Sequence, residues 1–174
     1  MSNWQSDKAW SDRFIPEIKS IVGPWLLVPS SLEQDRTEAA DLVVLKAAAM
    51  TIACRIRRPG FIAKYRNQFT IRCHRDSGAK TELAKITEGW GDWMFYGHSS
   101  ATHQYLDLWY LLDLSAWRAH LIRDRNQIRR GTIANGDGTE FAWFDITSFP
   151  ASPPLVIACS EIEHNQLQAA RAAG

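Results

Sequence analysis

Hydrophobic and polar residues alternate along three consecutive stretches of the chain, 41–46, 51–58 and 68–75. This period of two, together with their content of Val, Ile, Phe and Thr, predicts three β-strands. Apolar residues instead recur at helical spacing in 10–22, where Pro16 is tolerated only in a first turn and places the helix start near Phe14 or Ile15. A second helix is predicted over 81–89, between a start signal and a closing glycine.

The remaining pattern completes a chain of alternating elements. It predicts strands over 92–96 and 104–114, a helix over 117–130, a hairpin of strands 131–134 and 139–146, a strand over 155–159 and a helix from 161. We therefore expect an α/β or α+β fold with a mixed central sheet flanked by helices. At 174 residues a single domain is expected, with an αβββαβ core over 10–97 and an extension over 98–174 that adds the hairpin and the C-terminal helix.

The second predicted strand carries two arginines on one face. Arg55 and Arg57 alternate with Ile52, Cys54 and Ile56, so we expect the latter three on an apolar face that buries Cys54. Two interpretations of the arginine pair stay open. The pair is an ordinary exposed sheet face, or it faces phosphate, for which guanidinium offers a bidentate fork.

Positive charge is concentrated locally although the net charge of the chain is only +1. Between Arg55 and Lys85 there are nine Lys or Arg residues and two acids, and 117–130 forms a second basic region. Tyr65 lies between two cations, which suits a nucleic-acid backbone with a stacked base as well as an ordinary connector. The candidate nucleic-acid contacts are Arg55, Arg57, Arg58, Lys64, Arg66, Arg72 and Arg75.

Other features narrow the classes of protein. Three scattered cysteines form no CxxC pair, which argues against a disulfide framework or a structural zinc site. No apolar stretch reaches the roughly 18–20 residues of a membrane span, and we expect a cytoplasmic protein without membrane contact. Eight Trp residues favour an interface, so a homodimer or a protein partner is a further expectation.

The order helix, strand, strand, strand, helix, strand from Trp10 to Gly97 resembles the core of the PD-(D/E)XK nuclease superfamily, which includes Holliday-junction resolvases and restriction endonucleases. In that family a helix acid, a motif aspartate and the acid of an E-x-K motif hold Mg²⁺, and the lysine positions the attacking water. The resemblance implies Glu17 as the helix acid and Asp41 as the motif aspartate, with the E-x-K position at Arg55-Ile56-Arg57.

The chain departs from the family at this last position. Arg57 matches the lysine in charge, although Arg cannot act as a base, and Arg55 cannot bind a metal. One expectation is an endonuclease dependent on Mg²⁺ or Mn²⁺, with catalytic residues Asp41, Arg57, Glu82 and Lys85 and metal ligands Asp41, Glu17 and Glu82. The other is an inactive relative without metal, which binds DNA or a protein through its basic and Trp-rich surfaces.

Overall fold

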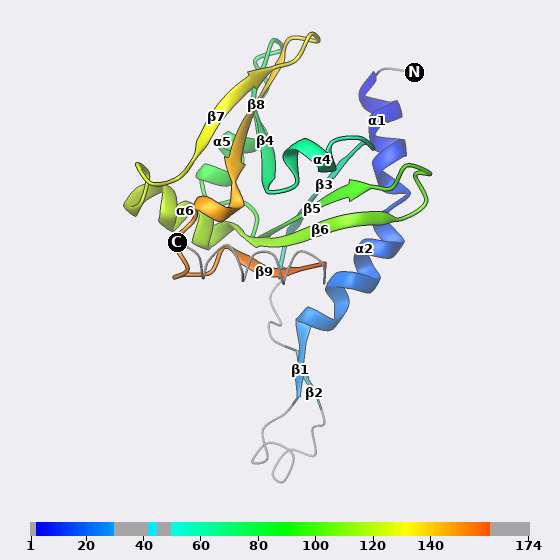
Figure 1. The fold of residues 1–174 in the computed structure, drawn as a ribbon, viewed down its shortest axis with the longest axis vertical. Coiled ribbons are helices and arrows are strands. Elements are labelled where there is room, and N and C mark those ends of the chain that lie inside the picture. The colour runs from blue at the N-terminus through cyan, green and yellow to red at the C-terminus, as the bar shows by residue number, and fades with distance from the viewer. Residues whose placement is uncertain (1–2, 30–41, 45–49, 161–174) are drawn as a thin grey trace. The chain divides into compact units, whose positions relative to one another are not determined.

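The protein is described by a computed structural model that covers residues 3–29, 42–44 and 50–160. The chain divides into two compact units, Met1–Met50 and Thr51–Gly174 (Figure 1). Within the described ranges, no helix combines the length and the hydropathy that crossing a membrane requires. The predicted C-terminal helix from 161 lies outside them.

The first unit consists of two helices and a short hairpin. Its elements are α1 (Asn3–Asp12), α2 (Ile15–Val22), the 3-10 turn η1 (Gly23–Leu26) and the antiparallel strands β1 (Leu27–Pro29) and β2 (Leu42–Val44). The start of α2 confirms the prediction, because Pro16 lies in its first turn. The separate helix α1 is not predicted, since it has no apolar stripe. It does carry an ion pair between Lys8 and Asp12 at the i,i+4 spacing that stabilises polar helices.

The second unit contains two sheets. The four-stranded sheet has the order β3 (Ile52–Arg57), β5 (Trp93–Ser99), β6 (Leu106–Asp113) and β9 (Val156–Cys159). In it β3 runs parallel to β5, and the other pairs are antiparallel. The three-stranded antiparallel sheet has the order β4 (Gln68–Arg75), β8 (Thr139–Asp145) and β7 (Arg130–Ala134). The predicted α+β class and the mixed sheet are confirmed.

The pairing of the strands differs from the expectation. The strands predicted at 41–46, 51–58 and 68–75 correspond to β2, β3 and β4, which fall in three different sheets of the described chain. The expected consecutive arrangement of these strands in one central sheet is therefore wrong. A turn at Pro59-Gly60 and the helical turn α4 (Ile62–Tyr65) separate β3 from β4, and β4 pairs instead with β8 of the hairpin far along the chain.

The hydrophobic core is formed by residues of the two sheets together with residues of the helices. Phe69 on β4 stacks on Phe144 of β8 with ring centroids 5.2 Å apart, and Trp117 meets Phe144 edge-on at 5.4 Å. Burying each such side chain contributes roughly 1.5–3 kcal/mol. Fully buried members of this cluster are Phe69, Ile71, Met94, Tyr96, Tyr110, Leu112, Leu114, Trp117 and Leu155.

One short helix of the second unit follows the start and stop signals of the sequence. The hydroxyl of Thr81 accepts a hydrogen bond from the Ala84 N–H at 3.2 Å and so caps α5 (Glu82–Thr87). Gly89 follows the helix with a φ of 99°, a value that favours glycine. The predicted helix 81–89 is thus confirmed, whereas α4 is a connector in which no helix is predicted.

The helix predicted over 117–130 is wrong at both ends. α6 runs from Leu114 to Arg123, because the carboxylate of Asp113 accepts the N–H groups of its first turn and fixes an earlier start. At the other end Asp124 contacts the buried His120 at 2.8 Å and closes the last turn. The hairpin predicted after it is confirmed as β7 and β8.

The hairpin supplies a test of packing. Gly131 lies directly opposite Trp143, and a Cβ at Gly131 would come within 2.8 Å of the indole Nε1. A rigid ring cannot move aside as the end of a flexible side chain can, so Gly131→Ala should lower the free energy of unfolding by about 1–3 kcal/mol in urea denaturation.

The matched control is Gly136→Ala in the same hairpin, where nothing lies within 4 Å of an added Cβ. We expect that change to alter the free energy of unfolding by no more than about 0.5 kcal/mol. Equal effects of the two substitutions would contradict the packing described for Trp143.

Candidate nucleic-acid interface

Arg55 and Arg57 lie on the core-facing side of the four-stranded sheet, at its margin. Arg55 pairs in register with Tyr96 and Arg57 with His98, and both partners are fully buried. Since β3 is the end strand of its sheet, the long arginine side chains reach solvent beside the core. Cys54 on the opposite face is exposed, so the expectation that it is buried is wrong. Alternation alone does not tell which face of a strand is covered.

A carboxylate and an aromatic ring hold two arginines in place. The guanidinium of Arg55 lies 4.2 Å from the ring centre of Phe141, and that of Arg72 lies 5.3 Å from the same ring. Glu82 accepts a hydrogen bond from Arg55 at 3.4 Å and another from the backbone N–H of Arg72 at 3.3 Å. Burial lowers the pKa of Arg55 from its usual value, and the negative charge of Glu82 opposes this shift.

Arg57 rests on a second pair of rings. Its guanidinium lies 4.9 Å from the ring centre of Phe61 and 5.5 Å from that of Tyr65. The two rings are 6.1 Å apart because α4 places residues four apart on the same side. The ammonium of Lys64 lies 5.2 Å from the Tyr65 ring centre. We call Phe61, Tyr65, Arg57 and Lys64 the aromatic platform.

His98 is a buried polar side chain next to this platform. It is fully buried, its ring meets Tyr96 edge-on at 5.6 Å, and neither ring nitrogen has a hydrogen-bond partner in the described part of the chain. Burial, and secondarily the positive charge of Arg57, lower the pKa of His98 to about 4. The imidazole is therefore neutral at physiological pH.

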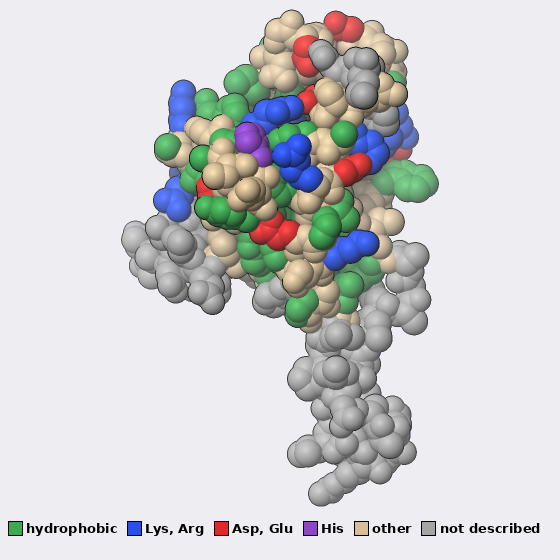
Figure 2. Space-filling model, turned by 90° about the vertical axis from the view of Figure 1, so that its right-hand side faces the viewer, with side chains coloured by type: hydrophobic (Ala, Val, Ile, Leu, Met, Phe, Trp, Pro, Cys, Tyr) green, Lys and Arg blue, Asp and Glu red, His purple; other side chains and the backbone are tan. Residues whose placement is uncertain are grey.

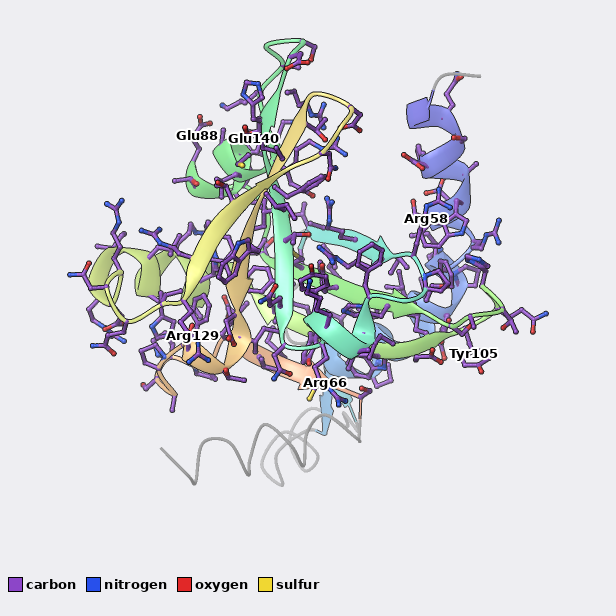
Figure 3. The ribbon with its side chains drawn as sticks, turned by 45° about the horizontal axis from the view of Figure 1, so that its top comes forward. Arg58, Arg66, Glu88, Tyr105, Arg129 and Glu140 are labelled. Atoms are coloured by element: carbon purple, nitrogen blue, oxygen red, sulfur yellow. The ribbon has the colours of Figure 1, made fainter. Side chains whose placement is uncertain are left out.

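The other predicted contacts lie on the same segments. Arg58 follows β3 and Arg66 follows α4, so these two residues bracket the turn that carries Phe61 and Tyr65 (Figure 3). Arg75 ends β4, and its Nε is buried without a hydrogen-bond partner among the described residues. Lys85 is exposed on α5, and the ion-pair partner seen for Glu82 is Arg55.

The residues expected to bind a metal are divided between the two units and the part of the chain that the structure does not describe. Asp41 lies outside the described residues, and Glu17 lies in the first unit. Glu82 contacts the guanidinium of Arg55, whose charge repels a cation. No group of three His, Cys, Asp or Glu residues suited to a metal occurs in the described ranges.

The second basic region engages most of its charge in internal contacts. Arg118 donates to two backbone carbonyls, each at 3.3 Å, Arg123 pairs with Asp124 at 3.0 Å, and Arg129 pairs with Asp145 at 2.9 Å. Figure 2 does not draw this region: it shows the right-hand side of Figure 1, where Lys and Arg side chains lie among apolar, acidic and polar ones, whereas α6 lies on the left-hand side. The margin around β3, β4 and α4 is therefore the better candidate interface.

Three residues of this margin are missed by the sequence analysis. Phe141 meets Arg55 and Arg72 only because β8 pairs with β4, and no local pattern indicates that pairing. His98 lies within a buried strand, where nothing distinguishes it from a structural histidine. Phe61 does have a signal, since its spacing of four from Tyr65 predicts two rings on one side of a helical turn.

Comparison of the chain with models of known protein families, with curated proteins and with solved structures finds no match in any of the three. The resemblance to the PD-(D/E)XK superfamily thus stays a prediction from the sequence.

The buried His98 predicts a dependence of stability on pH. Its pKa is about 4 in the folded chain and near 6.5 when exposed, so the unfolded chain binds more protons between these values. Acidification through this window favours unfolding, and His98 should account for a loss of about 3 kcal/mol in the free energy of unfolding between pH 6.5 and 4. Urea denaturation at several pH values measures this loss.

The variant His98→Phe has no group that titrates there, and it should lose this part of the pH dependence. His74→Gln is the control, because it removes a histidine whose side chain is 56% exposed and leaves the buried His98 in place. A pH profile of His98→Phe identical to that of the unaltered chain would show that His98 titrates normally.

Proposed function

We propose that the chain binds nucleic acid, in the first place DNA, and contacts phosphates through Arg55, Arg57 and Arg72. The observation that supports this is the arrangement of their guanidinium groups on aromatic rings at one margin of the second unit. Among the described residues, Glu82 is the one carboxylate that forms an ion pair with any of the three. The margin thus carries excess positive charge in a fixed geometry.

The geometry suits a phosphate backbone for two reasons. Arginines that rest on rings are already ordered, so less side-chain entropy is lost when they form bidentate hydrogen bonds to phosphate. In addition, the stretch 51–75 contains seven Lys or Arg residues and no Asp or Glu. A polyanion therefore meets little repulsion from the segments that carry β3, α4 and β4.

The proposed function is the binding of nucleic acid and does not include its cleavage. Hydrolysis of the PD-(D/E)XK kind requires carboxylates that hold a divalent cation, and Glu82 instead forms the counter-ion of Arg55. No cleavage step follows from the described residues. Cleavage that depends on Mg²⁺ or Mn²⁺ and on Asp41 stays a prediction of the family resemblance.

Removing two of these charges should weaken binding and reduce its dependence on salt. In the double variant Arg57→Gln/Arg72→Gln, the slope of log affinity against log salt concentration should decrease by roughly two, because each lost phosphate contact removes roughly one. Fluorescence anisotropy titrations of labelled DNA at a series of KCl concentrations measure the affinity and the slope together.

The matched control is Arg125→Gln/Arg130→Gln, which removes two exposed charges outside 51–75. Equal losses in both double variants, or an affinity that does not change with salt, would contradict the proposed interface. Gel analysis of the same DNA with added Mg²⁺ or Mn²⁺ separates binding from cleavage. Strand cleavage that disappears in Asp41→Ala would extend the proposal to a nuclease.

A second candidate function is protein interaction, and the exposure of Trp90 favours it. This side chain is 70% exposed between Gly89 and Gly91, whose φ values of 99° and 80° are typical of glycine. Tryptophan is a frequent anchor of protein interfaces. A second copy of the chain is the simplest partner for such an anchor.

For a homodimer anchored at Trp90, the variant Trp90→Ala should lower the mass measured by light scattering from two chains to one at equal concentration. Loss of a central interface tryptophan commonly costs about 2 kcal/mol or more, which is enough to dissociate a moderate dimer. Ile122→Ala, at an apolar side chain that is 86% exposed, is the control. A mass of one chain for the unaltered protein at every concentration rules out the homodimer.

A further inference from the structure

We propose that the aromatic platform selects single-stranded nucleic acid by stacking an unpaired base on Phe61, a specificity that rests on the proposed nucleic-acid binding. Phe61 is 42% exposed, whereas each of the other six Phe residues is at most 8% exposed. A large ring left in solvent beside basic side chains is unusual for a residue type that normally fills the core.

The ring of Phe61 is held in a fixed position. Its backbone carbonyl accepts the N–H of Tyr65 at 2.9 Å and that of Lys64 at 3.3 Å, which closes the turn of α4. The guanidinium of Arg57 lies against the rings of Phe61 and Tyr65 from strand β3. Phe61 is therefore braced by a cation while part of its surface stays open, and a base that stacks there meets an ordered partner.

The positive charge around the aromatic platform complements the phosphates of a nucleotide. Neither Arg57 nor Lys64 forms an ion pair with a carboxylate in the described part of the chain. A base that stacks on Phe61 carries phosphates on either side along its strand. Of the two uncompensated cations, Arg57 lies next to the Phe61 ring and Lys64 lies next to the neighbouring ring of Tyr65. Aromatic rings that stack bases inside a basic groove are the usual way in which proteins bind single strands.

A duplex does not offer the same contacts. Both faces of each internal base are stacked on neighbouring base pairs, so the duplex offers no exposed base face on which the Phe61 ring could stack. The helix α4 has four residues and is about 6 Å long, which is too short to act as a recognition helix in a major groove about 12 Å wide. A duplex thus gains only phosphate contacts at this surface, whereas a single strand also gains the stacked base.

The test compares three labelled ligands on the full chain by fluorescence anisotropy at low salt. They are an oligothymidine strand, an abasic strand of the same length and a duplex. We expect the unaltered chain to bind oligothymidine about tenfold more tightly than the abasic strand, because the abasic strand has no base to stack on Phe61. Phe61→Leu should bind oligothymidine about tenfold more weakly and should bind the abasic strand as the unaltered chain does.

Two further variants serve as controls. Phe61→Trp keeps a flat ring and should retain the preference for oligothymidine, whereas a tenfold loss in that variant would overturn the inference. Tyr105→Leu changes an aromatic side chain that is 53% exposed and lies outside 51–75, and it should leave all three affinities unchanged. Circular dichroism verifies that each variant is folded.

The outcomes distinguish the inference from the proposed function. Equal affinity of the unaltered chain for oligothymidine and the abasic strand would overturn base stacking, while salt-dependent binding of both would still support the proposed function. The same holds if folded Phe61→Leu keeps the full preference for oligothymidine. Failure of the unaltered chain to bind any of the three ligands at low salt would overturn the proposed function, and the inference with it.

Discussion

The carboxylate of Glu82 is the contact on which the basic margin of the second unit depends. It accepts hydrogen bonds from the side chain of Arg55 on β3 and from the backbone of Arg72 on β4, so one group on α5 connects both sheets. A largely buried guanidinium without a partner is costly, and the charges of Arg57 and Arg72 also act against that of Arg55. By offsetting this repulsion, Glu82 allows three like charges to lie close together on aromatic rings.

The same carboxylate has opposite roles in the two interpretations of this chain. As a metal ligand, Glu82 would contribute to a negative site that attracts a divalent cation. As the counter-ion of Arg55, it leaves a site whose net charge is positive. In the proposed function, guanidinium groups neutralise phosphate directly, a task that a bound cation performs in metal-dependent nucleases. The chemistry of the margin therefore follows from the identity of the residues at 55 and 57 more than from the order of the strands.

Local features of the fold were accessible from the sequence, and long-range pairings were not. β4 has the predicted bounds, and α5 begins at the predicted start signal, because alternation and capping act within a few residues. The partner of β4 is more than sixty residues away in sequence, and nothing in its own pattern specifies β8. The same limit applies to the site. The positive charge of 51–75 can be counted in the sequence. The ring of Phe141 lies next to Arg55 and Arg72 only because β8 pairs with β4.

The position of β3 at the end of its sheet has a consequence for colloidal behaviour. In the described part of the chain β3 has a strand neighbour on one side only, so its other edge is not paired with a described strand. Open edges of this kind are templates for aggregation, and natural proteins commonly protect them with charged side chains. Arg55 and Arg57 lie on this edge, and two copies that approached each other through β3 would bring four guanidinium groups together. In the proposed function, the arginines that contact a polyanion would thus also disfavour the pairing of β3 with a second chain.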